Sequence, residues 1–429
     1  MQPVTPWSSN ASFGPDGLSV AGLAATRLAE EFGTPLVVVD EDHLRARCRS
    51  FTGPFPRVLW AVKAFPLRAL IRIALEEGLG LLAATGGEVD ACLRAGAPGG
   101  SIVFHGNNKL DAEIEEAVRA RVGDLIVDNA EELRRIADRA EIAGIAQAVL
   151  LRVAPGVDVD AHEFVKTGAP DTKFGVPIAE GMALAALRRA LEMDDLEVRG
   201  IHLHVGSQLL DARPYGAALD VALDFLAEAR DATGYEARVL DLGGGMGTAY
   251  TDEDPLPPEA LGRDLQSRLD KGCADRGLSV PELVVEPGRA VTSGAALTLY
   301  RVGTIKDVPD VRTFVAVDGG MSDNIRPALY GARYTLALAS RAGAAGPRRV
   351  TVVGRHCESG DVLARDVDLP ADLSPGDLLA VASTGAYEYA MASTYNRVGR
   401  PAVVLVSAGH ARLIARREGY DDLARLDVE

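Results

Sequence analysis

The stretch RVLWAVKAFPLRALIRIALEEGLGLLAA, residues 57–84, predicts a strand, a helix and a second strand in succession. Short apolar runs open and close it, at 57–64 and 80–84, and such runs are typical of buried strands. Between them, at 66–78, apolar residues recur at spacings of three and four, which is typical of a helix with one buried face. The stretch therefore indicates the repeating unit of a parallel sheet with crossover helices.

The same alternation continues to residue 289. The apolar runs lie at 57–64, 80–84, 101–106, 124–129, 148–156, 198–206, 238–245 and 282–289. Helix patterns between them include 66–78, 130–144, 178–193 and 214–234. Eight strands alternating with helices predict an α/β fold of the (β/α)8 barrel type, which typically takes about 250 residues. An open doubly wound sheet is the weaker alternative, because no GxGxxG follows the first strand and polar residues end many strands.

The chain changes character after residue 290. Apolar runs with few helix signals lie at 297–307, 313–320, 348–354, 377–383 and 401–407, separated by Gly, Pro and Asp turns. We therefore predict a barrel domain over 41–290 and a mainly β domain formed by 291–429 and completed by 1–40. The run PLVVVD, at 35–40, and the helix pattern before it precede the first barrel strand, and we expect them to pair with that strand.

The composition disfavours several classes of partner. A net charge of −16 over 429 residues repels nucleic acids and anionic membranes. No window approaches the roughly 18 apolar residues of a membrane span, and the N-terminus lacks the basic and apolar regions of a signal peptide. The four cysteines, Cys48, Cys92, Cys273 and Cys357, form no CxxC, so we predict no metal site. These features predict a reduced, cytoplasmic protein.

Polar residues gather where the predicted barrel strands end, the face at which such barrels carry their active sites. They are Lys63, His105, Asn107, Asp128, Arg152, His204, Ser207, Gly243 to Gly245, Glu286 and Arg289. Lys63 lies in an otherwise apolar strand, where burial would lower the pKa of its ammonium and make a nucleophilic amine. From this residue alone, the alternative that its side chain extends out of the barrel mouth into solvent fits equally well.

Glycine-rich loops follow the seventh and eighth strands, DLGGGMG at 241–247 and EPGR at 286–289. Loops at these two positions frequently bind phosphate through bare backbone N–H groups. Adjacent glycines let the backbone approach an anion, and Arg289 adds a planar fork of donors. A glycine triplet alone is more often a tight turn, but the two loops together favour a phosphate site.

A nucleophilic lysine and a phosphate site together suggest pyridoxal phosphate (PLP), held by Lys63 as a Schiff base. Its pyridine nitrogen needs an acidic partner, because protonation makes the ring an electron sink, and Glu286 is the best-placed candidate. His204 would point into the barrel mouth, where its ring could stack on a flat cofactor, although a single histidine is more often structural. Ser207 follows on a glycine turn suited to hydrogen bonding a phosphate.

These residues also belong to motifs of a known family. The sequence resembles the meso-diaminopimelate decarboxylases, within the alanine-racemase-like, fold type III PLP enzymes. The resemblance runs nearly end to end and rests on ten motifs in family order: WAVKAF, TGGEVD, FHGNNK, HEFVKTGAPDTKFGVP, IHLHVGSQ, LDLGGGMG, EPGR, DGGMSDNIRPALYGA, CESGD and GAYEYAMASTYN. It implies decarboxylation of meso-2,6-diaminopimelate to L-lysine and carbon dioxide, the last step of lysine biosynthesis, by a PLP-dependent homodimer.

The resemblance also implies roles for individual residues. Lys63 would form the Schiff base, His204 would stack on the cofactor, and Glu286 would pair with the pyridine nitrogen. The cofactor and its phosphate would contact Ser207, Gly244, Gly245, Pro287, Gly288, Arg289 and Tyr387. The substrate would be handled by Arg289, Arg326, Tyr330, Glu358 and Tyr387. Cys357 would donate a proton from the second subunit of the dimer.

The chemistry of the substrate agrees with these roles. Diaminopimelate has two amino-acid heads, so one reacts at the cofactor and the other must be recognised as a zwitterion. Arg289 and Arg326 suit its carboxylate, and Glu358 suits its ammonium. Related ornithine-type decarboxylases place an acid where this sequence has Gly331, so a dicarboxylic substrate fits better. His356, beside the thiol, stands where smaller or apolar residues are common.

Other readings remain open from sequence. A related fold type III decarboxylase could act on ornithine, arginine, lysine or a secondary-metabolite substrate. A non-catalytic PLP-binding barrel is disfavoured, because that class lacks the C-terminal β domain that supplies Cys357, Glu358 and Tyr387. A Schiff-base aldolase without PLP would need no phosphate cradle around Glu286.

Overall fold

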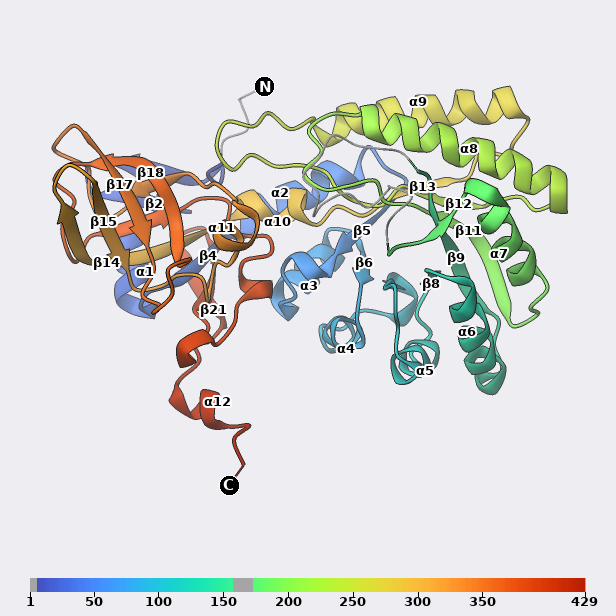
Figure 1. Ribbon diagram of the computed structural model, residues 1–429, viewed down its shortest axis with the longest axis horizontal. Helices are drawn as coiled ribbons and strands as arrows, with labels where there is room; N and C mark the ends of the chain where they lie inside the picture. Colours follow the sequence, from blue (N-terminus) through green and yellow to red (C-terminus); the bar gives the residue numbers. More distant parts are fainter. Residues whose placement is uncertain (1–5, 157–172, 429) are drawn as a thin grey trace. The chain divides into compact units, whose positions relative to one another are not determined.

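The computed structural model describes residues 6–156 and 173–428, and Figure 1 shows their course. The chain divides into two compact units. We call them the β unit, made of Met1–Arg47, Thr248–Asp254 and Arg289–Glu429, and the barrel unit, made of Cys48–Gly247 and Pro255–Gly288. Most of the motif HEFVKTGAPDTKFGVP, at 162–177, lies outside the described residues.

Eight parallel strands close into a ring in the barrel unit. They are β5 (Arg57–Ala61), β6 (Gly80–Ala83), β7 (Ile102–Phe104), β8 (Asp124–Val127), β9 (Gln147–Ala154), β11 (Leu196–His202), β12 (Val239–Asp241) and β13 (Glu282–Val285). Each pairs with the next, β13 pairs with β5, and the short β10 (Val176–Pro177) adds to β9. The predicted barrel is confirmed, and each predicted strand coincides with an observed one.

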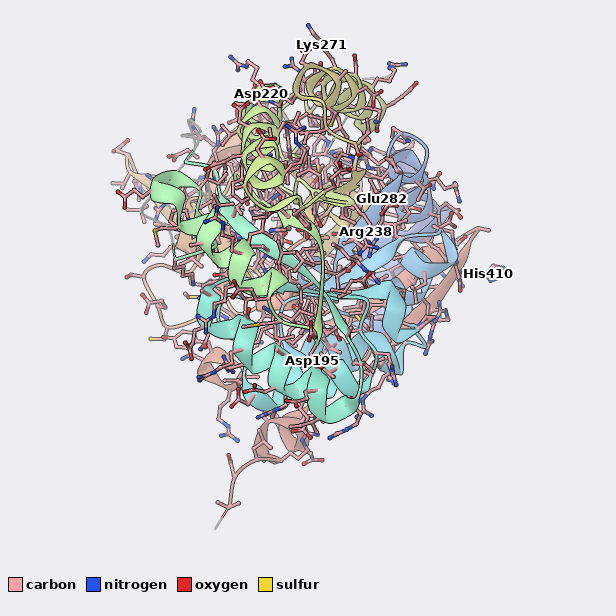
Figure 2. All side chains as sticks on the ribbon, turned by 90° about the vertical axis from the view of Figure 1, so that its right-hand side faces the viewer. Asp195, Asp220, Arg238, Lys271, Glu282 and His410 are labelled. Carbon is pink, nitrogen blue, oxygen red and sulfur yellow. The ribbon has the colours of Figure 1, made fainter. Side chains whose placement is uncertain are left out.

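Helices alternate with these strands (Figure 1). They are α2 (Glu41–Thr52), α3 (Arg68–Glu76), α4 (Gly86–Arg94), α5 (Asp111–Arg119), α6 (Ala130–Ala143), α7 (Met182–Leu191), α8 (Arg213–Thr233) and α9 (Pro258–Arg276). The Asn129 side chain begins α6 by accepting two backbone N–H bonds, and Gly144 ends it in the left-handed region. Asp220 on α8 and Lys271 on α9 are both exposed, on two helices that lie side by side (Figures 1 and 2).

An apolar layer fills the barrel. It consists of Leu59, Ala61, Leu82, Val103, Ile126, Leu150, Val239 and Val284. Because side chains alternate between the two faces of a strand, the residue two positions further on continues the same inward face. At those positions, where the strands end, the chain carries Lys63, His105, Asp128, Arg152, Asp241 and Glu286. The alternation therefore places polar groups above an apolar layer at the C-terminal mouth.

The β unit is built on a mixed sheet, which confirms the predicted mainly β domain. Its strand order is β18 (Val362–Pro370), β17 (Pro347–Val353), β15 (Arg312–Val317), β14 (Ala296–Val308), β4 (Leu36–Asp40), β20 (Ala402–Ser407) and β21 (His410–Ala415). β19 (Leu378–Val381) pairs with β14 and with β16 (Leu336–Leu338). Three short strands, β1 (Ala11–Gly14), β2 (Gly17–Val20) and β3 (Leu23–Ala24), form a separate sheet.

The remaining elements of the β unit are short helices. They are α1 (Ala25–Phe32), α10 (Arg289–Thr292), α11 (Arg326–Tyr330), α12 (Tyr420–Ala424) and the single turns η5 (Ser293–Ala295), η6 (Tyr389–Met391) and η7 (Tyr395–Arg397). In the described parts of the chain, no helix is both long and apolar enough to cross a membrane.

The run at 35–40 does not pair with the first barrel strand, so that expectation is wrong. It forms β4, which pairs antiparallel with β14 and parallel with β20. The neighbours of β5 are β6 and β13. All five residues of β4 are buried, and a strand that is apolar on both faces fits the centre of either sheet. The apolar pattern therefore predicted a strand but did not indicate which strands it pairs with.

Candidate active site

Lys63 lies in the single turn η1 (Val62–Ala64), directly after β5. Its side chain is exposed, although Val62 and Ala64 on either side are buried. Of the two alternatives left open by the sequence, burial in the strand and extension out of the barrel mouth, the structure shows the second, because the chain leaves the strand in a tight turn there. The ammonium still acts electrostatically on Glu286 and His204, so these three groups are near neighbours.

Glu286, Asp241 and His202 form a buried cluster at the ends of β13, β12 and β11. One side-chain atom of each lies within 4.8 Å of the other two, and His202 Nε2 is 3.3 Å from Glu286 Oε1. Asp241 Oδ1 accepts a hydrogen bond from Gly243 N–H at 2.8 Å, which ties the cluster to the glycine triplet. Sequence reasoning missed Asp241, although it follows Val239 by two positions and shares its inward face.

Burial controls the protonation of this cluster. It raises the pKa of Glu286 to about 7, and it raises the pKa of Asp241 well above its usual range, with the neighbouring Glu286 charge adding to that rise. Burial also lowers the pKa of His202 to about 4, so this ring is neutral at neutral pH. The two carboxyl groups therefore share at least one proton at neutral pH.

His204 is oriented by the glycine triplet. Its Nδ1 accepts a hydrogen bond from Gly244 N–H at 3.1 Å, so the neutral ring carries its proton on Nε2. Burial, followed by the charges of Lys63 and Arg152, lowers the pKa of His204 well below its usual range. A Cβ on Gly243 would lie 2.7 Å from His204 Nδ1, so only glycine lets the ring keep this place.

The barrel unit fits PLP on two observations. First, Glu286 Oε1 is buried and has no hydrogen-bond partner among the described residues, since its contact with His202 lacks hydrogen-bond geometry. Such an acceptor suits a protonated pyridine nitrogen. Second, a Cβ on Gly244 would lie 2.2 Å from Glu286 O and one on Gly245 would lie 2.3 Å from Gly206 O. The loop therefore consists of bare, closely packed backbone, as a phosphate cradle requires.

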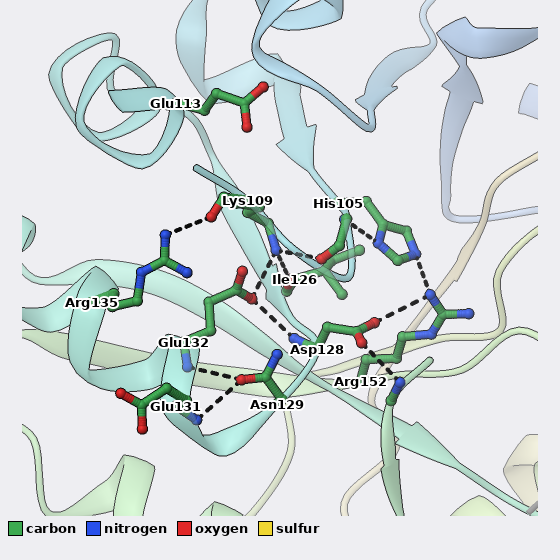
Figure 3. Close-up of polar contacts among 12 residues, drawn as sticks. His105, Lys109, Glu113, Ile126, Asp128, Asn129, Glu131, Glu132, Arg135 and Arg152 are labelled. Atoms are coloured by element: carbon green, nitrogen blue, oxygen red, sulfur yellow. Dashed lines mark hydrogen bonds and ion pairs between the residues drawn. The ribbon is translucent and has the colours of Figure 1, made fainter. Parts of the chain in front are cut away.

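A second buried network extends the polar mouth along β7, β8 and β9 (Figure 3). Lys109 Nζ donates to Glu132 Oε2 at 2.9 Å and to two backbone carbonyls, and Glu132 Oε2 also accepts from Asp128 N–H at 3.1 Å. Arg152 lies 3.4 Å from Asp128 Oδ1 and donates to His105 Nε2 at 3.0 Å. His105, Asp128 and Arg152, three of the strand-end residues predicted from sequence, thus belong to one connected set with Lys109 and Glu132, whereas Asn107 takes no part in these contacts.

Removing Lys109 should cost much stability, because the side chains of Lys109 and Glu132 are each 1% exposed. Lys109→Met leaves the Glu132 carboxylate buried without its cation, which we expect to lower the free energy of unfolding by about 3–5 kcal/mol. Urea unfolding measures this. The double variant Lys109→Met with Glu132→Gln should recover most of the lost free energy of unfolding.

The control is Arg94→Met, which breaks the exposed pair with Asp90 and should change the free energy of unfolding by less than about 1 kcal/mol. An equal loss in the control would contradict the account.

Arg326 and Arg289 donate hydrogen bonds to the same tyrosine hydroxyl in the β unit. Arg326 Nη1 donates to Tyr250 Oη at 2.9 Å, and Arg289 Nη1 donates to the same oxygen at 2.6 Å. The Arg289 guanidinium also lies over the Tyr387 ring, 4.9 Å from its centroid. Three predicted site residues, Arg289, Arg326 and Tyr387, are therefore neighbours within this unit.

Arg326 also has an acidic partner that sequence reasoning missed. Its Nη1 lies 3.5 Å from Glu388 Oε1 and donates to Tyr334 Oη at 2.7 Å, while the Tyr334 hydroxyl donates to Glu388. Burial raises the pKa of Glu388, and the charge of Arg326 opposes that rise. The signal for Glu388 was its place directly after Tyr387 in GAYEYAMASTYN. The guanidinium is thus held in one orientation by its own chain.

The other predicted residues lie on loops and on an exposed helix end. Cys357 and Glu358 are exposed on the turn between β17 and β18, and Tyr330, the last residue of α11, is 39% exposed. Ser207 follows β11, and Pro287 and Gly288 follow β13. The structure therefore brings together Lys63, His204, Glu286 and the glycines in one unit, and the arginines and Tyr387 in the other.

Comparisons with known proteins agree with this geometry. The family model for the pyridoxal-binding domain of pyridoxal-dependent decarboxylases matches residues 41–293. Diaminopimelate decarboxylase of Mycobacterium tuberculosis is 47% identical over 95% of this chain and 94% of its own, and that of Bacillus subtilis is 42% identical over 96% and 95%. The structure of diaminopimelate decarboxylase from "m. jannaschii", in co-complex with L-lysine, has a TM-score of 0.93 at 32% identity, over 98% of each chain.

Fold and site together define a pyridoxal-dependent decarboxylase. The sequence identity to curated relatives extends over both units of the chain, and these relatives are diaminopimelate decarboxylases. The chain belongs to the diaminopimelate decarboxylase family.

Proposed function

We propose that this chain decarboxylates meso-2,6-diaminopimelate to L-lysine and carbon dioxide, with PLP bound at the C-terminal ends of the barrel strands. The observation that carries the proposal is the buried, unpartnered Glu286 oxygen beside Lys63, His204 and the glycine triplet. The similarity to diaminopimelate decarboxylases across nearly the whole chain supports the substrate.

Each residue at the cofactor has a definite task in this proposal. Lys63 holds the cofactor covalently, His204 stacks on its ring, and Glu286 accepts the pyridine N–H. The remaining proposed cofactor contacts are Ser207, Gly244, Gly245, Pro287, Gly288, Arg289 and Tyr387. PLP, when bound, supplies an electron sink for the bond between Cα and its carboxylate. Burial raises the pKa of Asp241 well above its usual range, which favours a proton on Asp241 and so suits Glu286 to be the acceptor.

The reacting head needs one acid. The bond between Cα and the carboxylate breaks, carbon dioxide leaves, and the electron pair remains with the substrate. The Cys357 thiol donates a proton to Cα and regains one from solvent.

The distal head needs a cationic fork and an anion. Arg289 and Arg326, fixed through the Tyr250 hydroxyl, suit the distal carboxylate. Glu358 suits the distal ammonium, and Tyr330 and Tyr387 complete the proposed substrate contacts.

We propose that Cys357 and Glu358 act on the site of the partner subunit in a homodimer, which agrees with their exposure on a turn. The four free cysteines support the predicted reducing, cytoplasmic location.

The substrate is tested by carbon dioxide release from meso-diaminopimelate, ornithine, arginine and lysine measured side by side on the PLP-loaded enzyme. We expect release from diaminopimelate alone, with L-lysine formed in equal amount, because a cationic fork suits a second carboxylate that the three other substrates lack. Faster release from ornithine, arginine or lysine would replace this function by that of a related decarboxylase.

The shared site is tested by mixing two inactive variants. Lys63→Ala lacks the cofactor lysine and Cys357→Ala lacks the acid, so each homodimer should be nearly inactive. A heterodimer then contains one intact site, and an equal mixture at full exchange should regain up to about one quarter of wild-type turnover. Subunit exchange is verified by native mass spectrometry with differently tagged chains. Complete exchange without recovered turnover would show that each site is built from one chain.

A further inference from the structure

The turn that carries Cys357 and Glu358 is closed at its base by Asp361. Asp361 Oδ2 accepts the His356 N–H at 2.8 Å, and Oδ1 accepts the Met321 N–H at 2.7 Å. A Cβ on Gly354 would lie 2.2 Å from Asp361 Oδ2, so the carboxylate fits only beside glycine. The two ends of GRHCESGD therefore fix the base of the turn. The tip, which carries Cys357 and Glu358, is held by other contacts.

The tip is held by Asn396, which lies far along the sequence from the thiol. Asn396 Oδ1 accepts the Cys357 N–H at 3.3 Å, and it also lies 3.3 Å from His356 Nδ1. Because the Cys357 N–H can only donate, the amide atom that faces it is the oxygen. An amide oxygen only accepts, so His356 carries its proton on Nδ1 and its Nε2 accepts from the Ser322 hydroxyl at 2.9 Å.

The segment that presents Asn396 has an uncommon backbone. Asn396 has a φ of 51° and Arg397 a φ of 55°, both in the left-handed region. Non-glycine residues remain there only where their surroundings fix them, and asparagine tolerates the region better than most. The ring of Tyr395 packs against the buried His356 ring, with centroids 5.5 Å apart. The turn η7 and the thiol turn therefore form one packed unit.

We propose that Asn396 and His356 are positioning residues for proton transfer, which hold the backbone of Cys357 so that its thiol meets Cα. The proposal rests on the proposed function, in which Cys357 is the acid. A proton donor must come within hydrogen-bond reach of its acceptor, and a shift of about 1 Å can cost roughly 100-fold in rate. The Cys357 N–H bond to Asn396 restrains that position directly, and the His356 ring keeps the amide in place.

The variants separate the side chain from the backbone. Asn396→Gly removes the amide while tolerating the left-handed conformation, so it does not add strain as alanine would. Asn396→Asp keeps an acceptor oxygen and should restore the contact. Arg397→Gly places glycine at the neighbouring left-handed position and leaves Asn396 intact, which makes it the matched control. His356→Phe keeps the ring against Tyr395 and removes both nitrogen contacts.

Two readouts are measured on the PLP-loaded enzyme: hydrogen–deuterium exchange of the peptide covering 354–361, and kcat in both the wild-type and the Cys357→Ala backgrounds. In Asn396→Gly we expect faster exchange at the Cys357 amide and a kcat lower by roughly 10- to 100-fold. Asn396→Asp and Arg397→Gly should stay near wild type, and His356→Phe should change both readouts in the same direction by less. In the Cys357→Ala background, Asn396→Gly should cause no further loss, because both residues act through one thiol.

Unchanged exchange at the Cys357 amide in Asn396→Gly would overturn the proposal. So would an equal loss of kcat in the Cys357→Ala background, because Asn396 would then act independently of the thiol. A fully active Cys357→Ala enzyme would overturn the proposed acid itself. Exchange distinguishes these failures, since protection of the amide by Asn396 does not depend on turnover.

Discussion

Lys63→Ala is expected to abolish decarboxylation and the covalent attachment of PLP. Lys63 follows the first barrel strand and is exposed at the mouth, within electrostatic range of Glu286 and His204. Without its amine the cofactor has no covalent tether and the substrate must react with free aldehyde. We expect turnover to fall by more than about 1,000-fold, as for other residues that form the covalent bond.

The control is another exposed lysine of the same unit. Lys271 lies on the outer side of α9 (Figure 2), and Lys271→Ala should retain both cofactor and turnover. Absorption of the protein-bound cofactor and carbon dioxide release are measured on both variants. Substantial turnover in Lys63→Ala, with cofactor still fixed to the chain after borohydride treatment, would contradict the role of Lys63.

Glu286→Gln should produce the second large effect. Glutamine keeps the size of the side chain but carries no negative charge to stabilise a protonated pyridine nitrogen, so the cofactor would be a weaker electron sink. We expect kcat to fall by about 100- to 1,000-fold, the range found when one preorganised electrostatic contact is removed. Glu282→Gln is the matched control, because Glu282 begins the same strand and its side chain is 44% exposed. Equal effects of both substitutions would contradict the assignment.

The same variant makes a pH prediction for the cofactor-free protein. Burial raises the pKa of Glu286 to about 7 from a usual value near 4.5, so the folded state holds this proton more tightly than the unfolded state does. Stability contributed by the proton is full below about pH 4.5 and is lost as the pH rises to about 7, by about 3 kcal/mol. Glu286→Gln should lack that loss. Thermal unfolding between pH 4.5 and 8 measures it, and parallel curves for variant and wild type would contradict the raised pKa.

The sequence predicted the barrel because its strands are marked by short apolar runs with polar residues at their ends. Lys63, His204, the glycine triplet and Glu286 were found by reading those ends, and the structure places them together. Asp241 was missed because it begins the run DLGGGMG, which was interpreted as a glycine-rich loop. It nevertheless follows Val239 by two positions, and this alternation marks its side chain as inward-facing.

Other features needed three-dimensional information. The run that forms β4 is buried on both faces, so its pattern carries no preference between the barrel and the β sheet. Two partners of Arg326, Tyr250 and Glu388, come from distant segments that only the fold joins to it, whereas Tyr334 lies just after it in the sequence. The same is true of Asn396 and Cys357, which are joined by one hydrogen bond across 39 positions.

Borohydride reduction of the PLP-loaded enzyme, followed by peptide mass spectrometry, tests the central claim most directly. Reduction fixes the cofactor to the lysine that carries it and blocks tryptic cleavage there. We predict that the pyridoxyl group is found on the peptide spanning 58–68, which contains Lys63. A pyridoxyl group on Lys109 or any other lysine, with the 58–68 peptide unmodified, would contradict the account.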